Sequence, residues 1–327
     1  MIISRTPFRI SLFGGGSDYP AWYRERGGSV LGFAINKYCY ISLRELPPFF
    51  EHKHRIVYSK IEMVNNAQEI SHPSVKGVFK QLDIKKGLEI HHDGDLPARS
   101  GLGSSSSFTV GLVNALYALN GQMVSKQKLA SDTIHIEQNV IREHVGSQDQ
   151  VWAAFGGINR IDFSRDNDFR VTPLIMDHAK RTLLKNNLML YFTGVSRIAA
   201  TIAKKKIENL NKRRKSILQM IEMVDEGIKI VSGKIENFHN FGHLLHESWL
   251  LKRELASGVT NGELDDAYNA ARNAGALGGK VLGAGGGGFM IFYVEAEKQE
   301  AVAETLKKWL QVKIDFDMDG SKIVVFE

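Results

Sequence analysis

The sequence predicts an α+β protein with two lobes, and three observations support this fold class. The chain has 327 residues, 43% of them hydrophobic, so it can bury a large core and exceeds the usual size of one domain. Strand-like and helix-like runs mix over residues 1–185, whereas residues 186–274 are mostly helical before strands return. Helices and antiparallel strands gathered in two blocks indicate α+β architecture rather than a doubly wound sheet.

The first lobe, residues 1–185, is expected to hold several strands and the helices that cover them. Alternating or wholly apolar runs predict strands over 2–12, 29–35, 38–44, 55–61, 88–93, 156–163 and 169–175. Apolar residues at helical spacing predict helices over 74–84, 109–119 and 128–145.

The second lobe, residues 186–327, is expected to open with a strand over 187–194 and to continue as helices to about residue 274. Its remaining part predicts strands over 280–285 and 288–294, a helix over 298–310, and edge strands over 312–316 and 322–326.

Composition and charge limit the classes of protein to which the chain can belong. Cys39 is the only cysteine, which excludes an internal disulfide, and the first residues lack the layout of a signal peptide. We therefore expect a cytoplasmic protein. No apolar stretch reaches the ~18 residues that a membrane span needs, so no membrane partner is expected.

The basic excess, 42 Lys and Arg against 36 Asp and Glu, is concentrated in KKKIENLNKRRK at 204–215. This run favours a solvated helix face over a surface for acidic substrates or nucleic acid, because no aromatic residue interleaves it to stack bases. No nucleic-acid partner is expected.

A loop rich in glycine and serine, PARSGLGSSSSF at 97–108, lies between a predicted strand and a predicted helix. Free backbone N–H groups and the positive end of the helix dipole suit an anion at such a place. Gly101 and Gly103 would let the backbone approach that ligand without a side chain in between. The alternative is an ordinary serine N-cap, and the loop is not a Walker A sequence.

Two further glycine clusters occur, GGGSDYP at 14–20 and GAGGGGF at 283–289. Each taken alone could be a tight turn or a bulged hairpin. Three such clusters in one chain favour backbones that close around a charged ligand, as a nucleotide with a second substrate would require.

These residues carry a resemblance to a known superfamily. The segments RTPFRISLFGGGSDYP, PARSGLGSSSSF and KVLGAGGGGFMIFY resemble, in order and spacing, the three motifs of the GHMP kinases, which include galactokinase, homoserine kinase, mevalonate kinase and phosphomevalonate kinase. The resemblance implies an N-terminal lobe like ribosomal protein S5 domain 2 and a C-terminal ferredoxin-like lobe. It also implies ATP as phosphate donor, with the acceptor between the lobes.

Within the superfamily, three segments are most similar in sequence to those of kinases that act on D-glycero-D-manno-heptose 7-phosphate. These segments are PFRISLFGGGSDYP, FGGIN and YFTGVSR. That likeness implies phosphorylation of the C1 hydroxyl to the 1,7-bisphosphate, for nucleotide-activated heptose synthesis. Galactokinase has Gly-Glu-His where this chain has Gly15, Gly16 and Ser17, which argues against galactose. A fucokinase- or galactokinase-like enzyme and a non-catalytic sugar-binding relative stay open, as does a homodimer.

The resemblance assigns the nucleotide to the serine loop. Its ATP-binding residues would be Ser100, Gly101, Leu102, Gly103, Ser104, Ser105 and Ser106, with Tyr58 and Ser59 as candidates for the adenine pocket.

Asp149 resembles the family's catalytic base, which would deprotonate the acceptor hydroxyl, and Arg9 resembles the arginine beside it. An arginine there would favour the ionised carboxylate and neutralise developing charge. The alternatives are a helix-capping Asp149 and an Arg9 that faces solvent from a strand.

Glu137, on the predicted helix 128–145, resembles the family's acidic ligand of Mg²⁺, with Ser105 as second ligand and Ser104 in reserve. A charged residue on an amphipathic helix would otherwise face solvent.

Asp18 resembles the family's sugar-hydroxyl ligand, although as a turn residue it would need no function. We expect Gly15, Gly16, Ser17, Gly285 and Gly286 to border the substrate. Arg197 is a candidate for the remote phosphate, because an arginine fork binds phosphate oxygens bidentately, with a surface salt bridge as the alternative. Three histidines at helical spacing, His239, His243 and His246, favour packing over a zinc site because a distant ligand is missing.

Overall fold

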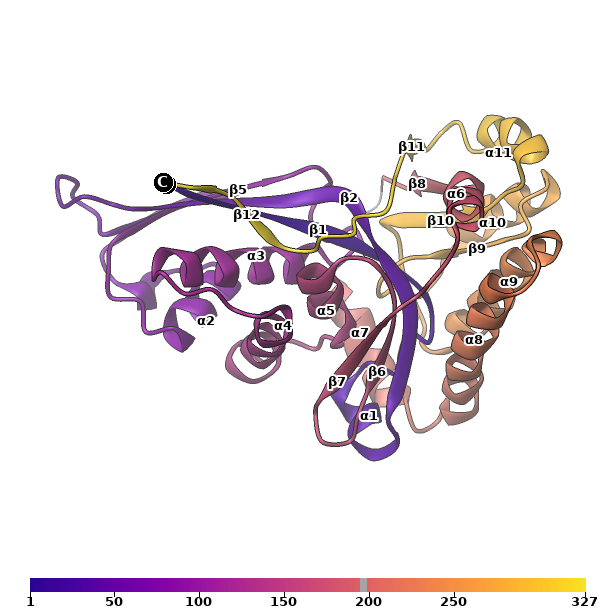
Figure 1. Ribbon diagram of the computed structural model, residues 1–327, viewed down its shortest axis with the longest axis horizontal. Coiled ribbons are helices and arrows are strands. Elements are labelled where there is room, and N and C mark those ends of the chain that lie inside the picture. Colours follow the sequence, from indigo (N-terminus) through magenta and orange to yellow (C-terminus); the bar gives the residue numbers. More distant parts are fainter. Residues whose placement is uncertain (195–198) are drawn as a thin grey trace.

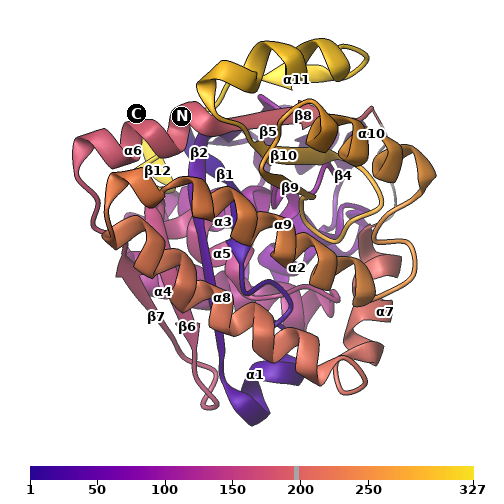
Figure 2. The same ribbon diagram turned by 90° about the vertical axis from the view of Figure 1, so that its right-hand side faces the viewer.

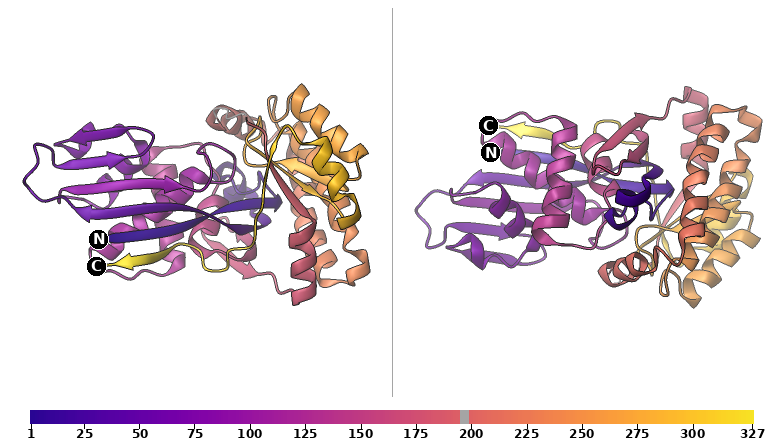
Figure 3. Two further views of the ribbon diagram at one scale, coloured as in Figure 1. Left: turned by 90° about the horizontal axis from the view of Figure 1, so that it is seen from above. Right: turned by 90° about the horizontal axis from the view of Figure 1, so that it is seen from below.

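The computed structural model describes residues 1–194 and 199–327. Two antiparallel-rich sheets, each with its own helices, form a long N-terminal unit and a smaller C-terminal unit (Figure 1). Both chain ends lie at the same end of the N-terminal sheet (Figure 3). Within the described ranges, no helix combines the length and apolar character needed to cross a bilayer.

The N-terminal sheet has eight strands in the order β12-β1-β2-β5-β3-β4, with β6 and β7 attached to the other part of β2. The bounds are β1 (Ile2–Phe13), β2 (Gly28–Glu45), β3 (His54–Val57), β4 (Ile61–Val64), β5 (Leu88–Gly94), β6 (Ile158–Phe163), β7 (Phe169–Pro173) and β12 (Lys322–Phe326). β2 replaces the two strands expected over 29–35 and 38–44, because a bulge opposite Pro7 and Phe8 absorbs the irregular residues between them.

Four main helices cover one face of this sheet, α2 (Pro73–Gln81), α3 (Ser104–Leu119), α4 (Lys126–His135) and α5 (Gln148–Phe155) (Figure 1). Shorter elements are α1 (Pro20–Arg26), η1 (Ala67–Glu69) and η2 (Ile136–Ile141). α3 packs on β1 and β2 and is buried along most of its length, as its mainly apolar sequence requires. The helix predicted over 109–119 is confirmed, with its start at the serines.

The C-terminal sheet has the order β11-β8-β10-β9, with every neighbouring pair antiparallel. Its strands are β8 (Leu188–Phe192), β9 (Gly278–Val281), β10 (Phe289–Tyr293) and β11 (Leu310–Val312). In chain order, one strand, a set of helices, two strands, a helix and a last strand follow each other. This is the split βαβ arrangement of a ferredoxin-like lobe, and it confirms that expectation.

Helices of the C-terminal unit also bridge to the N-terminal sheet (Figure 2). The helices are α6 (His178–Asn187), α7 (Ala199–Asn209), α8 (Arg214–Ser232), η3 (Ile235–Asn237), α9 (His239–Glu254), α10 (Gly262–Asn273), η4 (Ala296–Lys298) and α11 (Gln299–Thr305). α9 packs on β9, α8 packs on α9 and β2, and the rings of Phe13 and Phe241 meet edge to face at 5.2 Å. One apolar core therefore runs through both units.

Some predicted elements were wrong. The expected strand 55–61 is the hairpin of β3 and β4, because residues 58–60 turn. The helix α6 was not predicted, since its polar sequence lacks a long apolar stripe. The edge strand expected over 312–316 is β11, which ends at Val312. The boundary at residue 185 stays a prediction, but the final strand, β12, departs from it by pairing with β1 of the N-terminal sheet.

Candidate active site

The serine loop, residues 97–108, and the third glycine loop, residues 283–289, contact each other through their backbones. The N–H of Phe289 donates to the carbonyl of Ser100 at 3.1 Å. A Cβ on Gly283 would lie 2.6 Å from Cα of Gly101, and one on Gly288 would lie 2.2 Å from the Ser100 carbonyl oxygen. Glycine is therefore required where the two units touch. Turn formation alone does not explain these glycines.

The serine loop leads directly into α3, whose N-cap is Gly103 in the left-handed region at φ 77°. Leu102 is buried and its carbonyl accepts a hydrogen bond from the Arg9 N–H at 3.1 Å, which fixes the loop to β1. No serine side chain caps the helix, so the serine N-cap alternative is wrong. The free N–H groups of the first turn and the dipole of this helix favour an anion.

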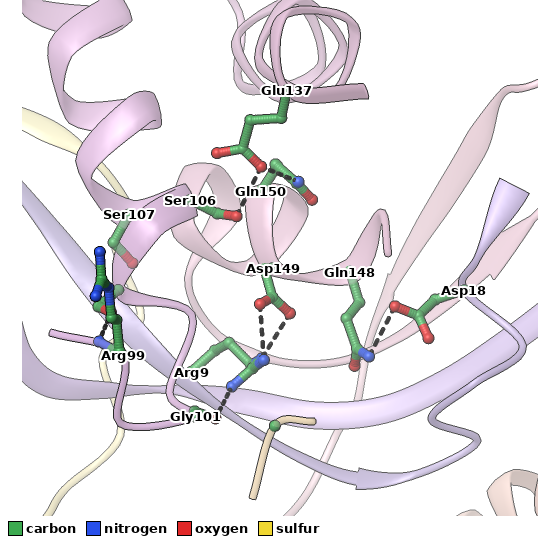
Figure 4. A network of polar contacts seen from close by, with 12 residues as sticks. Arg9, Asp18, Arg99, Gly101, Ser106, Ser107, Glu137, Gln148, Asp149 and Gln150 are labelled. Carbon is green, nitrogen blue, oxygen red and sulfur yellow. Dashed lines mark hydrogen bonds and ion pairs between the residues drawn. The ribbon is translucent and has the colours of Figure 1, made fainter. Parts of the chain in front are cut away.

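Arg9 and Asp149 form a bidentate ion pair beside this loop (Figure 4). Arg9 Nε donates to Asp149 Oδ1 at 2.8 Å and Nη2 donates to Oδ2 at 2.7 Å, while Nη1 donates to the Gly101 carbonyl at 2.8 Å. The Arg9 side chain is 6% exposed and that of Asp149 is 24% exposed. The cap of α5 is Ser147, so Asp149 is not a capping residue, and Arg9 does not face solvent.

Asp18 is almost fully buried beside the first glycine loop. Its carboxylate accepts hydrogen bonds from the Gly16 N–H and from Nε2 of Gln148 at 2.9 and 2.8 Å. Burial raises the pKa of Asp18, and the nearby carboxylate of Asp149 adds to that rise. The side chain is therefore not an exposed turn residue, and it is held by Gln148, the chain neighbour of Asp149.

Glu137 lies on η2, a π-helical turn, and is fully buried. Its Oε2 accepts hydrogen bonds from Ser106 Oγ at 2.8 Å and from Gln150 Nε2. Its Oε1 has no partner in the described part of the chain. Burial raises the pKa of Glu137 to about 7. The alternative, a Glu137 side chain that faces solvent, is wrong.

The serine on Glu137 is Ser106, whereas the sequence pointed to Ser105. Ser105 is exposed because successive residues of a helix are rotated by about 100°, so only one of two neighbours faces η2. Ser104, the reserve choice, accepts a hydrogen bond from the Arg99 N–H at 3.1 Å.

Three residues expected to border the substrate, Ser17, Gly285 and Gly286, also make contacts within the protein. The Ser17 hydroxyl is enclosed and contacts the carbonyl oxygens of Gly14 and Ser29 at 2.8 and 3.0 Å, so it holds the loop and faces no open space. The Gly286 N–H donates to the Val259 carbonyl at 2.8 Å, and a Cβ on Gly285 would lie 2.6 Å from that oxygen. Gly285 and Gly286 therefore pack on a neighbouring turn.

Tyr58 lies in an aromatic cluster that adjoins α3. Its ring meets His72 edge to face at 4.8 Å, and His72 stacks on Phe108 at 4.6 Å. Burial lowers the pKa of His72, which favours the neutral ring. Ser59 is exposed in the turn between β3 and β4.

Sequence reasoning missed three buried lysines, Lys206 on α7, Lys252 on α9 and Lys280 on β9. Burial lowers the pKa of Lys206 to about 8 and that of Lys280 to about 7, and it lowers the pKa of Lys252 as well. The only signal was Lys280 inside the apolar strand of the third motif. Arg197 lies outside the described residues.

Of the three histidines on α9, His246 packs on a neighbouring helix, as expected. Its Nδ1 lies 2.6 Å from the Tyr268 hydroxyl of α10. Among residues 1–194 and 199–327, no three His, Cys, Asp or Glu side chains are grouped to hold a metal ion.

Two family models match the chain. Residues 70–157 match the GHMP kinases N-terminal domain, and residues 231–311 match the GHMP kinases C-terminal domain. The first match contains the serine loop, Glu137 and Asp149.

Among curated proteins, the chain is 29% identical to a D-glycero-alpha-D-manno-heptose 7-phosphate kinase of Campylobacter jejuni over 94% of this chain and 93% of that protein. It is 26% identical to an L-fucokinase/L-fucose-1-P guanylyltransferase of Bacteroides fragilis, over 92% of this chain and 35% of that longer protein.

Among solved structures, a D-glycero-D-manno-heptose 1-phosphate kinase from Bacteroides thetaiotaomicron matches with a TM-score of 0.81 at 25% identity and full coverage of both chains. Lactococcus lactis galactokinase with bound galactose matches with a TM-score of 0.74 at 20% identity, covering 98% and 94% of the two chains, which supports the fold alone.

Proposed function

This chain is a GHMP kinase, an ATP-dependent phosphotransferase of the sugar-kinase type, and we propose that its acceptor is D-glycero-D-manno-heptose 7-phosphate, phosphorylated on the C1 hydroxyl. The likeness to the Campylobacter jejuni 7-phosphate kinase over nearly the whole of both chains supports this acceptor. The Bacteroides thetaiotaomicron relative is also named for a heptose phosphate. The product would be the 1,7-bisphosphate.

The observation that carries the proposed chemistry is the Arg9–Asp149 pair beside the start of α3. A Cβ on Gly103 would lie 3.3 Å from Asp149 Oδ2, so the carboxylate is next to the loop that would hold the phosphates of ATP. Arg9 occupies one edge of the carboxylate in two hydrogen bonds, and the exposed remainder of Asp149 is free to contact an acceptor hydroxyl. Phosphoryl transfer depends mainly on such positioning.

In the proposed step, the C1 hydroxyl gives its proton to Asp149 while its oxygen forms a bond to the γ-phosphorus of ATP. The bond from that phosphorus to the bridging oxygen breaks, and ADP leaves with the electron pair. Arg9 keeps Asp149 in place and supplies positive charge beside the transferring group. The N–H groups at the start of α3 bind the phosphate oxygens.

Glu137 and Ser106 would hold Mg²⁺. Oxygen donors suit this cation, and the buried, unpartnered Oε1 of Glu137 supplies one in the described part of the chain. The cation held there would neutralise negative charge on the phosphates of ATP. For the adenine, the cluster of Tyr58, His72 and Phe108 offers aromatic surface beside the same helix.

A coupled assay of ADP release tests the proposed acceptor with a panel that contains heptose 7-phosphate, its unphosphorylated sugar, fucose and galactose. We expect kcat/KM for heptose 7-phosphate to exceed that of the other sugars by at least about 100-fold. A preference for fucose would favour the fucokinase-like alternative, which the Bacteroides fragilis relative supports.

A further inference from the structure

Three lysine side chains are buried in the C-terminal unit, although lysine is almost never buried without a partner. Lys206 on α7 is 5% exposed, Lys252 on α9 is 6% exposed and Lys280 on β9 is 2% exposed. They belong to three separate elements, so the orientation of a single helix does not explain their burial.

Two of these lysines donate hydrogen bonds to backbone carbonyl groups, which are neutral, and not to carboxylates that would balance a positive charge. Lys252 Nζ donates to the carbonyls of Val281 and Gly283 at 2.6 and 2.8 Å. Lys280 Nζ donates to the Leu12 carbonyl at 2.5 Å. Each ammonium has three N–H donors, so both lysines keep at least one donor for a ligand.

Lys206 differs from the other two, because it has no hydrogen-bond or ion-pair partner within residues 1–194 and 199–327. Burial lowers the pKa of Lys206, and the negative charge of the Asp18 carboxylate opposes this effect in part. Burial lowers the pKa of Lys252, and the charges of Lys206 and Lys280 lower it further. The elements that carry Lys252 and Lys280, α9 and β9, pack directly on each other.

When all three lysines are protonated, the charges in this region do not balance. Asp149 is paired with Arg9, so Asp18 is the carboxylate whose negative charge acts on Lys206 and Lys252. A phosphate monoester carries close to two negative charges at neutral pH. Asp18 and one such phosphate together would neutralise the three ammonium groups.

The contacts of the lysines lead to the acceptor side of the site. Leu12, which accepts from Lys280, lies two residues before the first glycine loop, and Asp18, whose charge acts on Lys206, belongs to that loop. Gly283, which accepts from Lys252, begins the third glycine loop. In the described chain, none of the three donates a hydrogen bond to the serine loop proposed for ATP.

We propose that Lys206, Lys252 and Lys280 form the subsite for the phosphate group that the acceptor sugar already carries. This inference rests on the proposed function, because it assumes a phosphorylated acceptor. Asp18 would then bind a sugar hydroxyl between that subsite and the reacting C1 hydroxyl. The lysines select phosphorylated over unphosphorylated sugar.

The substitution Lys206→Met tests the subsite, because Lys206 holds no loop and its removal disturbs the fold least. Lys205→Met is the matched control, since Lys205 is exposed on the same helix. We expect Lys206→Met to raise KM for heptose 7-phosphate by about 10- to 100-fold, as the loss of a charged hydrogen bond predicts, and to leave KM for ATP within about 2-fold. Lys205→Met should match the wild type, and Lys206→Arg should restore part of the affinity.

Binding of inorganic phosphate, followed by calorimetry without ATP, separates this inference from the proposed function. Wild-type protein should bind phosphate, and Lys206→Met should bind it at least about 10-fold more weakly. Unchanged phosphate binding, or an equal rise in KM for ATP and sugar, would overturn the subsite. No turnover of heptose 7-phosphate by the wild type would refute the proposed acceptor. Loss of phosphate binding in Lys206→Met would then still support a subsite for another sugar phosphate.

Discussion

At the scale of single residues, the first turn of α5 organises the polar network of the site (Figure 4). Consecutive side chains of a helix point about 100° apart, so three neighbours can reach three different groups. The contacts are Gln148 with Asp18, Asp149 with Arg9 and Gln150 with Glu137. One helical turn therefore sets the relative positions of the proposed sugar ligand, base and cation ligand.

Replacing the proposed base tests its role directly. We expect Asp149→Asn to lower kcat by about two to four orders of magnitude, the usual effect of losing a general base, and to leave ATP binding near that of the wild type. Steady-state kinetics and ATP titration measure the two quantities. Asp166→Asn, in an exposed turn, is the control and should be unaffected. Near-normal turnover of Asp149→Asn would remove this residue from the mechanism.

The cation site is tested by the dependence of rate on Mg²⁺ concentration. Glu137→Gln should raise the Mg²⁺ concentration needed for the half-maximal rate, because a neutral amide is a poorer ligand, and excess Mg²⁺ should restore part of the activity. Ser106→Ala should share this effect, since Ser106 contacts Glu137. If only Ser105→Ala changed the Mg²⁺ dependence of the rate, Ser105 would be the serine ligand, as the sequence suggested. An unchanged Mg²⁺ dependence in every variant would exclude this cation site.

Residue types were easier to predict from the sequence than contacts. The motifs pointed to Arg9, Asp18, Glu137 and Asp149, and the first turn of α5, which carries Asp149, contacts the other three. Their roles remain predictions. The sequence pointed to Ser105 and not to Ser106, because the rotation of α3 that decides which serine faces Glu137 depends on tertiary packing.

At the scale of elements, the site depends on loops that approach one another so closely that only glycine fits at the points of contact. The first glycine loop is held against the segment before α5, where the Ser147 N–H donates to the Asp18 carbonyl at 2.9 Å. A Cβ on Gly146 would lie 1.9 Å from Asp18 Oδ2. Because the atom met is the end of a side chain, the carboxylate can move away while the backbone stays.

Gly146→Ala should therefore displace Asp18 at little cost to folding. We expect KM for the sugar to rise at least about 10-fold, KM for ATP to stay within about 2-fold, and the free energy of unfolding to fall by about 1 kcal/mol, because only the carboxylate must shift. Kinetics and urea unfolding measure these effects. Gly262→Ala is the control, because nothing lies within 4 Å of its added Cβ. A rise of KM for ATP alone would contradict the placement of Asp18 on the sugar side.

At the scale of the whole molecule, the two units share one core and bring distant charges together. Periodicity and motif order were enough to predict two α+β lobes, because each is a local property of the chain. The lysine cluster could not be predicted, because α7, α9 and β9 converge only in the folded protein. Likewise, no local pattern indicated that β12 would return to the first sheet.

The buried lysines predict how the stability of the ligand-free protein depends on pH. Lys206 has a pKa of about 8 when folded and about 10.4 when unfolded, so between these values the unfolded state binds more protons. The free energy of unfolding should therefore rise with pH in this window. Relative to wild type, Lys206→Met should lose about 1.4 kcal/mol per pH unit of that slope.

Urea unfolding at pH 8, 9 and 10 in phosphate-free buffer measures the slope, and Lys205→Met should run parallel to the wild type. Lys280 and Lys252 contribute in the same direction in both proteins, because burial lowers their pKa values as well. Parallel curves for Lys206→Met and wild type would mean that Lys206 is not held in a low-dielectric, ligand-free site.

The position of the new phosphate in the product is the most direct test of the central claim. After turnover of heptose 7-phosphate with ATP, phosphorus and proton NMR of the purified product can identify each phosphorylated carbon. We expect a 1,7-bisphosphate with a phosphorus coupling to the anomeric proton, formed with one ADP per sugar. A new phosphate on any other carbon, or turnover only with unphosphorylated sugars, would contradict it.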